Sequence, residues 1–438
     1  MLRNQASVEE FELLASGVTP GFAAAPYQFT HGKGARLFDA DNNDYIDFCA
    51  GTFTNSIGHA HPIAVKFMQE RIAELWNIHD YSTPLRIKLL RLLNEMTPEH
   101  IDTFQFYTGG SETIEAGLRA LHSYLPPERA KIVSFAGAYH GKTLGSRQLF
   151  GWQFPGESDC DITRLPFPDK FGLPAEQKNA YEQHCLELIE SYFANDLHIG
   201  AVIYEPVLGA GGNLNASPLF WKQFNQLCKQ FGVLQFVDEI CVGFGRLGHD
   251  FSFQQYDIEP DLVAFAKGIG GGFPTMCIGG RKEIINAKPF GEKGGASTTF
   301  GGNPLSLAAM YITIQIYQQE QLAANAKDLE TQLKDHVEKL ASAFPDIFDF
   351  RVTGLMATLN LKHGTEEETK RFALTLHRHC LAQGVKVMTF DHLFRIAPPL
   401  NISTTDLDEG LNRMFAAFEL TTQQGAVRTD SENLCPSV

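Results

Sequence analysis

The middle of the sequence alternates between short apolar segments and segments with helical periodicity, and this alternation constrains the fold more than any other feature. Residues 201–206, 233–239 and 261–268 (AVIYEP, VLQFVDE and DLVAFAKG) are almost continuously apolar. Strands have this character when helices cover both faces of a parallel sheet. The segment WKQFNQLCKQF at 221–231 follows the first of them and has the pattern of a helix. We therefore expect a mainly parallel sheet with helices on both sides.

Neighbouring segments extend this expected sheet. Further strands are predicted at 103–108, 131–137 and 275–280 (TFQFYT, KIVSFAG and TMCIGG). After the first of these, apolar side chains recur at the spacing of one helical face: Ile114, Leu118, Leu121 and Leu125.

The two ends of the chain have a different order of predicted helices and strands. Residues 36–48 (RLFDADNNDYIDF) predict a hairpin, and a helix is expected at 63–78. Beyond residue 310 the pattern predicts helices at 323–344 and 366–383, strands at 350–361, 385–390 and 393–397, and a last helix capped by Thr405 and Asp408. We expect an α/β fold: a large domain at 63–310, and a smaller α+β domain built from residues 1–62 and 311–438.

The charge balance narrows the possible partners. The chain has 438 residues, with 36 Lys and Arg against 51 Asp and Glu, a net charge of −15. Nucleic-acid binding needs basic surfaces, so we expect no nucleic-acid partner. No apolar run approaches the length of a membrane span, and the first residues lack a signal-peptide pattern. We expect a cytoplasmic protein without a membrane partner. Its low charged fraction, 20%, suggests surface buried against another subunit.

The sequence TGGSE at 108–112 lies between a predicted strand and a predicted helix. Backbone N–H groups at a helix N-terminus bind anions, glycine permits close approach, and Ser111 adds a hydroxyl. Neither a G-K-[ST] nor a G-x-G-x-x-G pattern is present, so a nucleotide loop is not indicated. The segment predicts a phosphate site, with a plain turn and helix cap as the alternative.

Two charged positions end predicted strands. Asp238 and Glu239 follow VLQFV, and ligands bind at the carboxyl ends of strands in open α/β sheets. Lys267 follows LVAFA and precedes a glycine-rich run; a partly desolvated lysine becomes a nucleophilic amine. The alternatives are acids that cap a helix and a lysine that extends to solvent.

Together these features supply what pyridoxal phosphate needs. A lysine forms a Schiff base with the cofactor, an aspartate keeps the ring nitrogen protonated, and a helix N-terminus holds the phosphate. Tyr139 follows another predicted strand and could cover one face of the ring. Pyridoxal phosphate is therefore the predicted cofactor.

The chain resembles the class III, or omega, aminotransferases of the fold-type-I pyridoxal-phosphate enzymes. The resemblance spans nearly the whole chain and rests on short motifs in a specific order: GHAHP (58–62), TGGSE (108–112), YHGKT (139–143), EPVLGAGG (205–212), DEICVGFGRLG (238–248), AKGIGGG (266–272), TTFGGNPL (298–305), GLM (354–356) and RIAPPL (395–400).

The resemblance implies roles for individual residues. Lys267 would form the Schiff base and move the proton, and Asp238 would pair with the ring nitrogen. Ile240 would pack opposite Tyr139, and His140 and Glu205 would surround the cofactor. The phosphate would be held by Gly109, Gly110 and Ser111, and by Thr299 of a partner, because the sites of this family are shared across a homodimer interface. Arg395 would bind the carboxylate of an oxo acid.

Two positions depart from the family pattern. In relatives that use 2-oxoglutarate, an acid in an EPVxGEGG motif gates the carboxylate-binding arginine, and here that position is Ala210. The resemblance is then greater to the branch that uses pyruvate. Many relatives have glutamine near the ring hydroxyl, where this chain has Cys241.

The expected activity is transfer of an amino group from a primary amine or omega-amino compound to an oxo acid, pyruvate or 2-oxoglutarate. Three alternatives are open: an aminomutase resembling the glutamate-semialdehyde enzyme, other carbon–nitrogen chemistry with the same cofactor, and a catalytically inactive binding protein of this fold. A nicotinamide dehydrogenase is disfavoured because the dinucleotide fingerprint is missing. No metal site is expected, because no two cysteines have C-x-x-C spacing.

Overall fold

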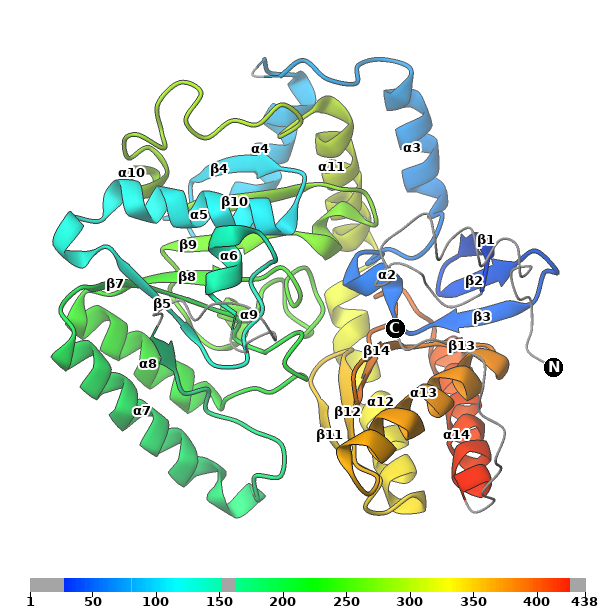
Figure 1. Ribbon diagram of the computed structural model, residues 1–438. Helices are drawn as coiled ribbons and strands as arrows, with labels where there is room; N and C mark the ends of the chain where they lie inside the picture. The colour runs from blue at the N-terminus through cyan, green and yellow to red at the C-terminus, as the bar shows by residue number, and fades with distance from the viewer. Residues whose placement is uncertain (1–26, 80, 151–162, 426–438) are drawn as a thin grey trace.

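A sheet of seven strands forms the centre of the computed structural model, which describes residues 27–79, 81–150 and 163–425 (Figure 1). In spatial order the strands are β4 (Thr103–Tyr107), β10 (Met276–Gly280), β9 (Leu262–Phe265), β8 (Leu234–Asp238), β7 (Ile199–Tyr204), β5 (Lys131–Phe135) and β6 (Arg164–Leu165). Only β10 runs against its neighbours within this described sheet. The expected mainly parallel sheet is confirmed.

Helices cover both faces of this sheet. Side chains of alternating strand positions separate into two apolar clusters, because successive residues of a strand point to opposite faces. Ala201 and Ile203 of β7 pack with α5 (Gly110–Tyr124), whereas Val202 and Tyr204 pack with α8 (Pro218–Phe231). The continuous apolar character of these strands follows from burial on both sides.

The α8 helix illustrates how local sequence fixes the ends of these elements. Ser217 caps its start, since the hydroxyl accepts a hydrogen bond from the amide of Phe220 at 3.2 Å. Pro218 occupies the first helical position, where no backbone donor is needed. Gly232 ends the helix in a left-handed conformation with φ 63°.

The remaining helices and turns lie around the central sheet, except that the last three helices pack with strands from the two ends of the chain. They are α2 (Ala50–Phe53), α3 (Pro62–Ile72), α4 (Pro84–Met96), η2 (Pro127–Arg129), α6 (Leu144–Gln148), η3 (Ala175–Gln177), α7 (Lys178–Asn195), α9 (Ser252–Gln255), η4 (Lys267–Gly270), α10 (Lys282–Ile285), α11 (Pro304–Gln319), α12 (Leu322–Ala343), α13 (Glu366–Ala382) and α14 (Thr404–Gly425).

The N- and C-terminal segments lie beside each other (Figure 1). One sheet has the order β1 (Phe29–Lys33), β2 (Arg36–Asp39), β3 (Asp44–Asp47) and β13 (Val385–Lys386). A second has the order β11 (Phe348–Val352), β12 (Ala357–Leu361), β15 (Leu393–Ile396) and β14 (Met388–Phe390). The predicted hairpin is confirmed, as β2 and β3 pair antiparallel.

Four expectations for secondary structure were wrong in detail. The single strand expected at 350–361 is a hairpin, because the chain reverses at Gly354, where φ is 56°. The strand expected at 385–390 divides between two sheets. The helix expected to reach residue 78 ends at Ile72. The last helix is capped by Ser403, whose hydroxyl accepts from the amide of Asp406 at 3.0 Å, and not by Thr405.

Within the described ranges, no helix is long and apolar enough to cross a membrane.

Candidate active site

Four neighbouring strands bring polar side chains to one edge of the central sheet. Asp238 ends β8, Glu205 directly follows β7, and Lys267 lies two residues beyond the end of β9. Tyr139 lies four residues beyond β5. Since these strands are parallel and adjacent, their carboxyl ends form the edge at which α/β sheets bind ligands.

The N-terminus of α5 adds a possible anion site. Gly109 precedes the helix in an extended conformation, and Gly110 and Ser111 form its first turn. The first amides of an α-helix have no partner within the helix and attract negative charge. Among the described residues, a side chain at Gly110 would meet only Ile240, at 3.9 Å, so this part of the chain leaves the space in front of the turn open. The Ser111 hydroxyl accepts a bond from the amide of Lys142 at 3.0 Å.

Asp238 and His140 form a buried pair at the end of β8. Nδ1 of His140 donates to Oδ2 of Asp238 at 2.8 Å, and each residue is 2% exposed. The other oxygen, Oδ1, accepts from the amide of Ile240 at 3.0 Å. Nε2 of His140 is buried and has no hydrogen-bond partner among the described residues. The pair therefore holds the Asp238 carboxylate in one orientation.

Glu205 joins two loops of the site. Its Oε1 accepts from the amide of Tyr139 at 2.9 Å, and its Oε2 accepts from the amide of Gly209 at 2.8 Å. Burial, with a smaller contribution from the nearby charge of Asp238, raises the pKa of Glu205 to about 7. Glu205 therefore fixes the backbone beside Tyr139 while lying close to both members of the Asp238–His140 pair.

Lys267 occupies a strained position. Its φ is 47°, in the left-handed region that residues with a side chain rarely adopt. Nζ lies 2.7 Å from Sγ of Cys241 and 5.4 Å from the centre of the Phe53 ring. The next residue is anchored, since the Ser56 hydroxyl donates to the carbonyl of Gly268 at 2.5 Å. The backbone is thus held so that the lysine amine points at the thiol.

Cys241 lies within the site and is buried. Burial raises the pKa of its thiol, although the charge of Lys267 opposes this shift. A side chain at Gly209 would lie 2.7 Å from Sγ of Cys241, so only glycine permits this approach. Cys241 therefore lies between the amine of Lys267 and Gly209, whose amide donates to Glu205.

Arg395 reaches the site from β15. It is 6% exposed, and its Cζ lies 4.7 Å from the centre of the Phe53 ring. Nη1 lies 3.9 Å from Sδ of Met388, while Nε and Nη2 are buried without a hydrogen-bond partner in the described part of the chain. Burial lowers the pKa of Arg395. Phe53 and Met388 were missed in the sequence, where no periodic pattern marks either of them.

Thr299 differs from the other predicted residues, because the structure does not bring it into the site of its own chain. It is exposed, and its carbonyl accepts a bond from Nδ2 of Asn77 at 3.0 Å. The neighbouring Phe300 is 61% exposed.

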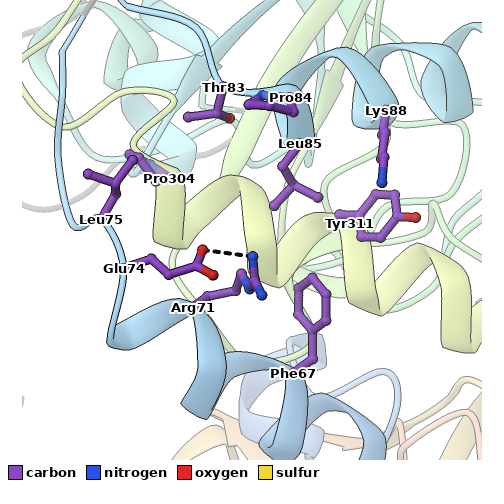
Figure 2. A pocket seen from close by; sticks show the side chains of 10 residues that line it. All are labelled: Phe67, Arg71, Glu74, Leu75, Thr83, Pro84, Leu85, Lys88, Pro304 and Tyr311. Carbon is purple, nitrogen blue, oxygen red and sulfur yellow. Dashed lines mark hydrogen bonds and ion pairs between the residues drawn. The ribbon is translucent and has the colours of Figure 1, made fainter.

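A surface cavity of about 430 Å³ lies between α3, α4 and α11, apart from the sheet edge (Figure 2). Phe67, Leu85 and Tyr311 contribute apolar surface, and Arg71 and Glu74 form an ion pair at 2.7 Å beside them. None of the predicted site residues lines this cavity. The described residues also contain no cluster of three or more potential metal ligands.

The arrangement at the sheet edge fits pyridoxal phosphate. A helix N-terminus with open space before Gly110 can accept the phosphate, and a fixed carboxylate can pair with a protonated ring nitrogen. Lys267 supplies an amine, and Tyr139 and Ile240 lie beside these groups. Two nitrogens of Arg395, which have no partner among the described residues, add a place for a substrate carboxylate.

Comparisons of the sequence and of the structure with known proteins all find aminotransferases. The sequence model of the family described as "Aminotransferase class-III" matches residues 19–418. The chain is 31% identical to the succinylornithine transaminase of Photorhabdus laumondii over 92% of this chain and 96% of that one. It is 31% identical to the acetylornithine aminotransferase of Mesorhizobium japonicum, over 90% and 94%. The structure matches an (S)-enantioselective omega-transaminase from Thermomicrobium roseum with TM-score 0.84 and 26% identity, over 95% and 99%.

Proposed function

This chain belongs to the class III aminotransferases, enzymes that depend on pyridoxal phosphate, and from that premise we propose how its own residues perform the transfer. The amino group moves from a primary amine or omega-amino compound to an oxo acid, with Lys267 as the Schiff-base lysine. One observation carries the proposal: Lys267, Asp238 and the N-terminus of α5 meet at one edge of the sheet. None of the reported relatives favours an aminomutase or an inactive protein.

Pyridoxal phosphate supplies an electron sink that stabilises negative charge on the substrate carbon. Gly109, Gly110 and Ser111 would hold its phosphate, and the Asp238 carboxylate would pair with its ring nitrogen. The bond from His140 keeps that carboxylate aligned. Tyr139 and Ile240 would enclose the ring.

Lys267 moves the proton between the substrate carbon and the cofactor. Its Nζ lies beside Cys241 and, as a free amine, would accept and return a proton. The left-handed backbone of Lys267 and the bond from Ser56 to Gly268 keep this amine at the end of β9. Little reorganisation is needed during the reaction, which favours catalysis.

Arg395 binds the carboxylate of the oxo acid. Two of its nitrogens are buried without partners among the described residues, and a carboxylate would satisfy both in a bidentate pair. Because Ala210 stands where a gating acid stands in relatives that use 2-oxoglutarate, we expect pyruvate to be the preferred acceptor. A donor panel assayed with each acceptor separately tests this preference.

A homodimer with shared sites fits the surface of the chain. Several large apolar side chains are exposed on α3, α4 and the loops next to them: Ile63, Val65, Ile72, Leu75, Trp76, Tyr81, Ile87, Phe273 and Phe300. Leu75 also lines the cavity of Figure 2, and exposed apolar side chains that gather in one region are typical of an interaction site. Thr299 lies in this region and would reach the phosphate in the partner's site.

The chain divides into a large domain at 63–310 and a smaller domain at 1–62 and 311–438. The pairing of β3 with β13 supports this division, because it joins the two ends of the chain in one sheet.

We also place the enzyme in the cytoplasm, where its substrates are small soluble molecules.

Replacement of Lys267 by alanine tests the proposal. The variant should bind the cofactor without a covalent link and lose at least about 100-fold in kcat. Retention of full activity would reject Lys267 as the central residue.

A further inference from the structure

The ring of Phe53 lies close to three cationic side chains. Residues Ala50 to Phe53 all have positive φ, from 46° to 67°, and so form a left-handed turn. Such a turn is costly for residues with side chains, and persists only where the surroundings enforce it. The Phe53 ring lies 5.4 Å from Nζ of Lys267, 5.8 Å from Cζ of Arg246 and 4.7 Å from Cζ of Arg395.

Arg395 is the nearest of these cations to the Phe53 ring, and it makes weaker hydrogen bonds than Arg246 does. Arg246 donates through Nη1 to the carbonyls of Leu355 and Pro398, at 3.0 and 2.7 Å. Among the described residues, Nη1 of Arg395 contacts the thioether of Met388 at 3.9 Å, and Nε and Nη2 are buried without a hydrogen-bond partner. A buried guanidinium without an acid needs another contact to fix its position.

The face of an aromatic ring provides such a contact. A cation within about 6 Å of the ring centre is attracted to the π face, more strongly when water is excluded. This attraction orients the guanidinium without neutralising it, whereas a gating acid would pair with its charge. The charge of Arg395 therefore stays available to a substrate carboxylate.

We propose that Phe53 is a positioning residue that holds Arg395 for the carboxylate of the oxo acid. The inference rests on the proposed role of Arg395 as the carboxylate anchor. Phe53 itself makes no bond to the carboxylate. Its removal lets the guanidinium leave the position that it holds over the ring.

The test compares Phe53→Leu, Phe53→Tyr and Arg395→Ala holoenzymes. Leucine keeps an apolar side chain but removes the π face, and tyrosine restores that face. Steady-state kinetics should give a KM for pyruvate raised about tenfold in Phe53→Leu, with kcat nearly unchanged, and restored in Phe53→Tyr. Calorimetric titration with pyruvate, without an amine donor, should show the same change in Kd.

Phe244→Leu is the matched control. Phe244 is also buried and also has a positive φ, 56°, but its ring contacts are aromatic: Phe251, Phe265 and Tyr317. The control should leave the KM for pyruvate unchanged, which separates loss of the cation contact from the general cost of replacing a buried phenylalanine in a left-handed position.

The outcomes separate the two proposals. If Arg395→Ala raises the pyruvate KM but Phe53→Leu does not, the positioning role is rejected and the anchor role stands. If Arg395→Ala also leaves KM and Kd unchanged, both are rejected. An equal rise in KM for pyruvate and for a simple alkylamine donor in Phe53→Leu also contradicts the inference, because a donor without a carboxylate does not need Arg395.

Discussion

Nδ1 of His140 lies 2.8 Å from Oδ2 of Asp238, and both side chains are excluded from water. The carboxylate can only accept hydrogen bonds, so the imidazole donates, and Asp238 is held with one oxygen on His140 and the other on the amide of Ile240. The orientation of the group that would pair with the cofactor nitrogen is therefore set before the cofactor binds.

Asp238→Asn should lower kcat by at least about 100-fold, because a neutral amide cannot stabilise a protonated ring nitrogen. The asparagine has nearly the same shape, so the fold should be retained. Stopped-flow measurement of the half-reaction with an amine donor, together with circular dichroism, checks both points. Activity close to that of the parent enzyme would show that the ring nitrogen does not depend on Asp238.

Cys241→Val should slow proton transfer by about 2- to 10-fold, since it removes the polar group 2.7 Å from the amine of Lys267. Cys241→Ser keeps a polar group at this position and should stay within about twofold of the parent. The deuterium isotope effect on the donor carbon is the decisive measurement, and it should rise in the valine variant only. Equal isotope effects in both variants would count against a role for the thiol.

Glu239 gives a prediction about stability and pH. The carboxyl is buried, Oε1 accepts bonds from Ser252 and Phe253, and Oε2 has no hydrogen-bond partner in the described ranges. Burial raises the pKa of Glu239 from its ordinary value of 4.5 to about 7. Below pH 4.5 the group is protonated in both states. Between pH 4.5 and 7 the unfolded state loses its proton first, so stability falls as the pH rises.

Glu239→Gln removes this penalty while keeping the side-chain shape. The variant should be more stable than the parent at pH 8, by up to roughly 3 kcal/mol, and nearly equal to it at pH 4.5. Urea unfolding of the holoenzyme at the two pH values measures the difference. A gain of equal size at both values would point to a cause other than ionisation.

Ile72→Glu should weaken the proposed dimer, because it places a charge on the exposed apolar surface of α3. The expected result is a lower mass in analytical ultracentrifugation and weaker cofactor retention, since Thr299 of the partner would be withdrawn. Leu219→Glu is the control: Leu219 is 63% exposed but lies on α8. A dimer that survives Ile72→Glu unchanged would place the interface elsewhere.

Much of the central sheet could be predicted from the sequence. The strands β7, β8 and β9 are short and almost continuously apolar, and they alternate with helical segments, so they could be predicted as strands buried on both faces. Asp238 and Lys267 stood out because a charged residue directly after such a strand is unusual. Their roles in catalysis stay predictions until the variants are measured.

Other features could not be predicted, because they depend on contacts between distant segments. Phe53 reaches the site through a left-handed turn with no periodic signature. The residues 385–390 look like one strand, yet Val385 pairs with Ile46 and Met388 pairs with Arg395. The first two residues pair with β3 and the last three pair with β15, and sequence pattern does not reveal such distant partners. Met388 and Arg395 lie opposite each other because β14 and β15 pair in this register.

The central claim is that Lys267 carries the cofactor, and reduction with borohydride followed by peptide mass spectrometry tests it most directly. Reduction makes the link between lysine and cofactor permanent, so the modified peptide can be sequenced. We predict one phosphopyridoxyl group per chain, located on Lys267. Its recovery on another lysine, or its absence from a chain loaded with pyridoxal phosphate, would contradict the account.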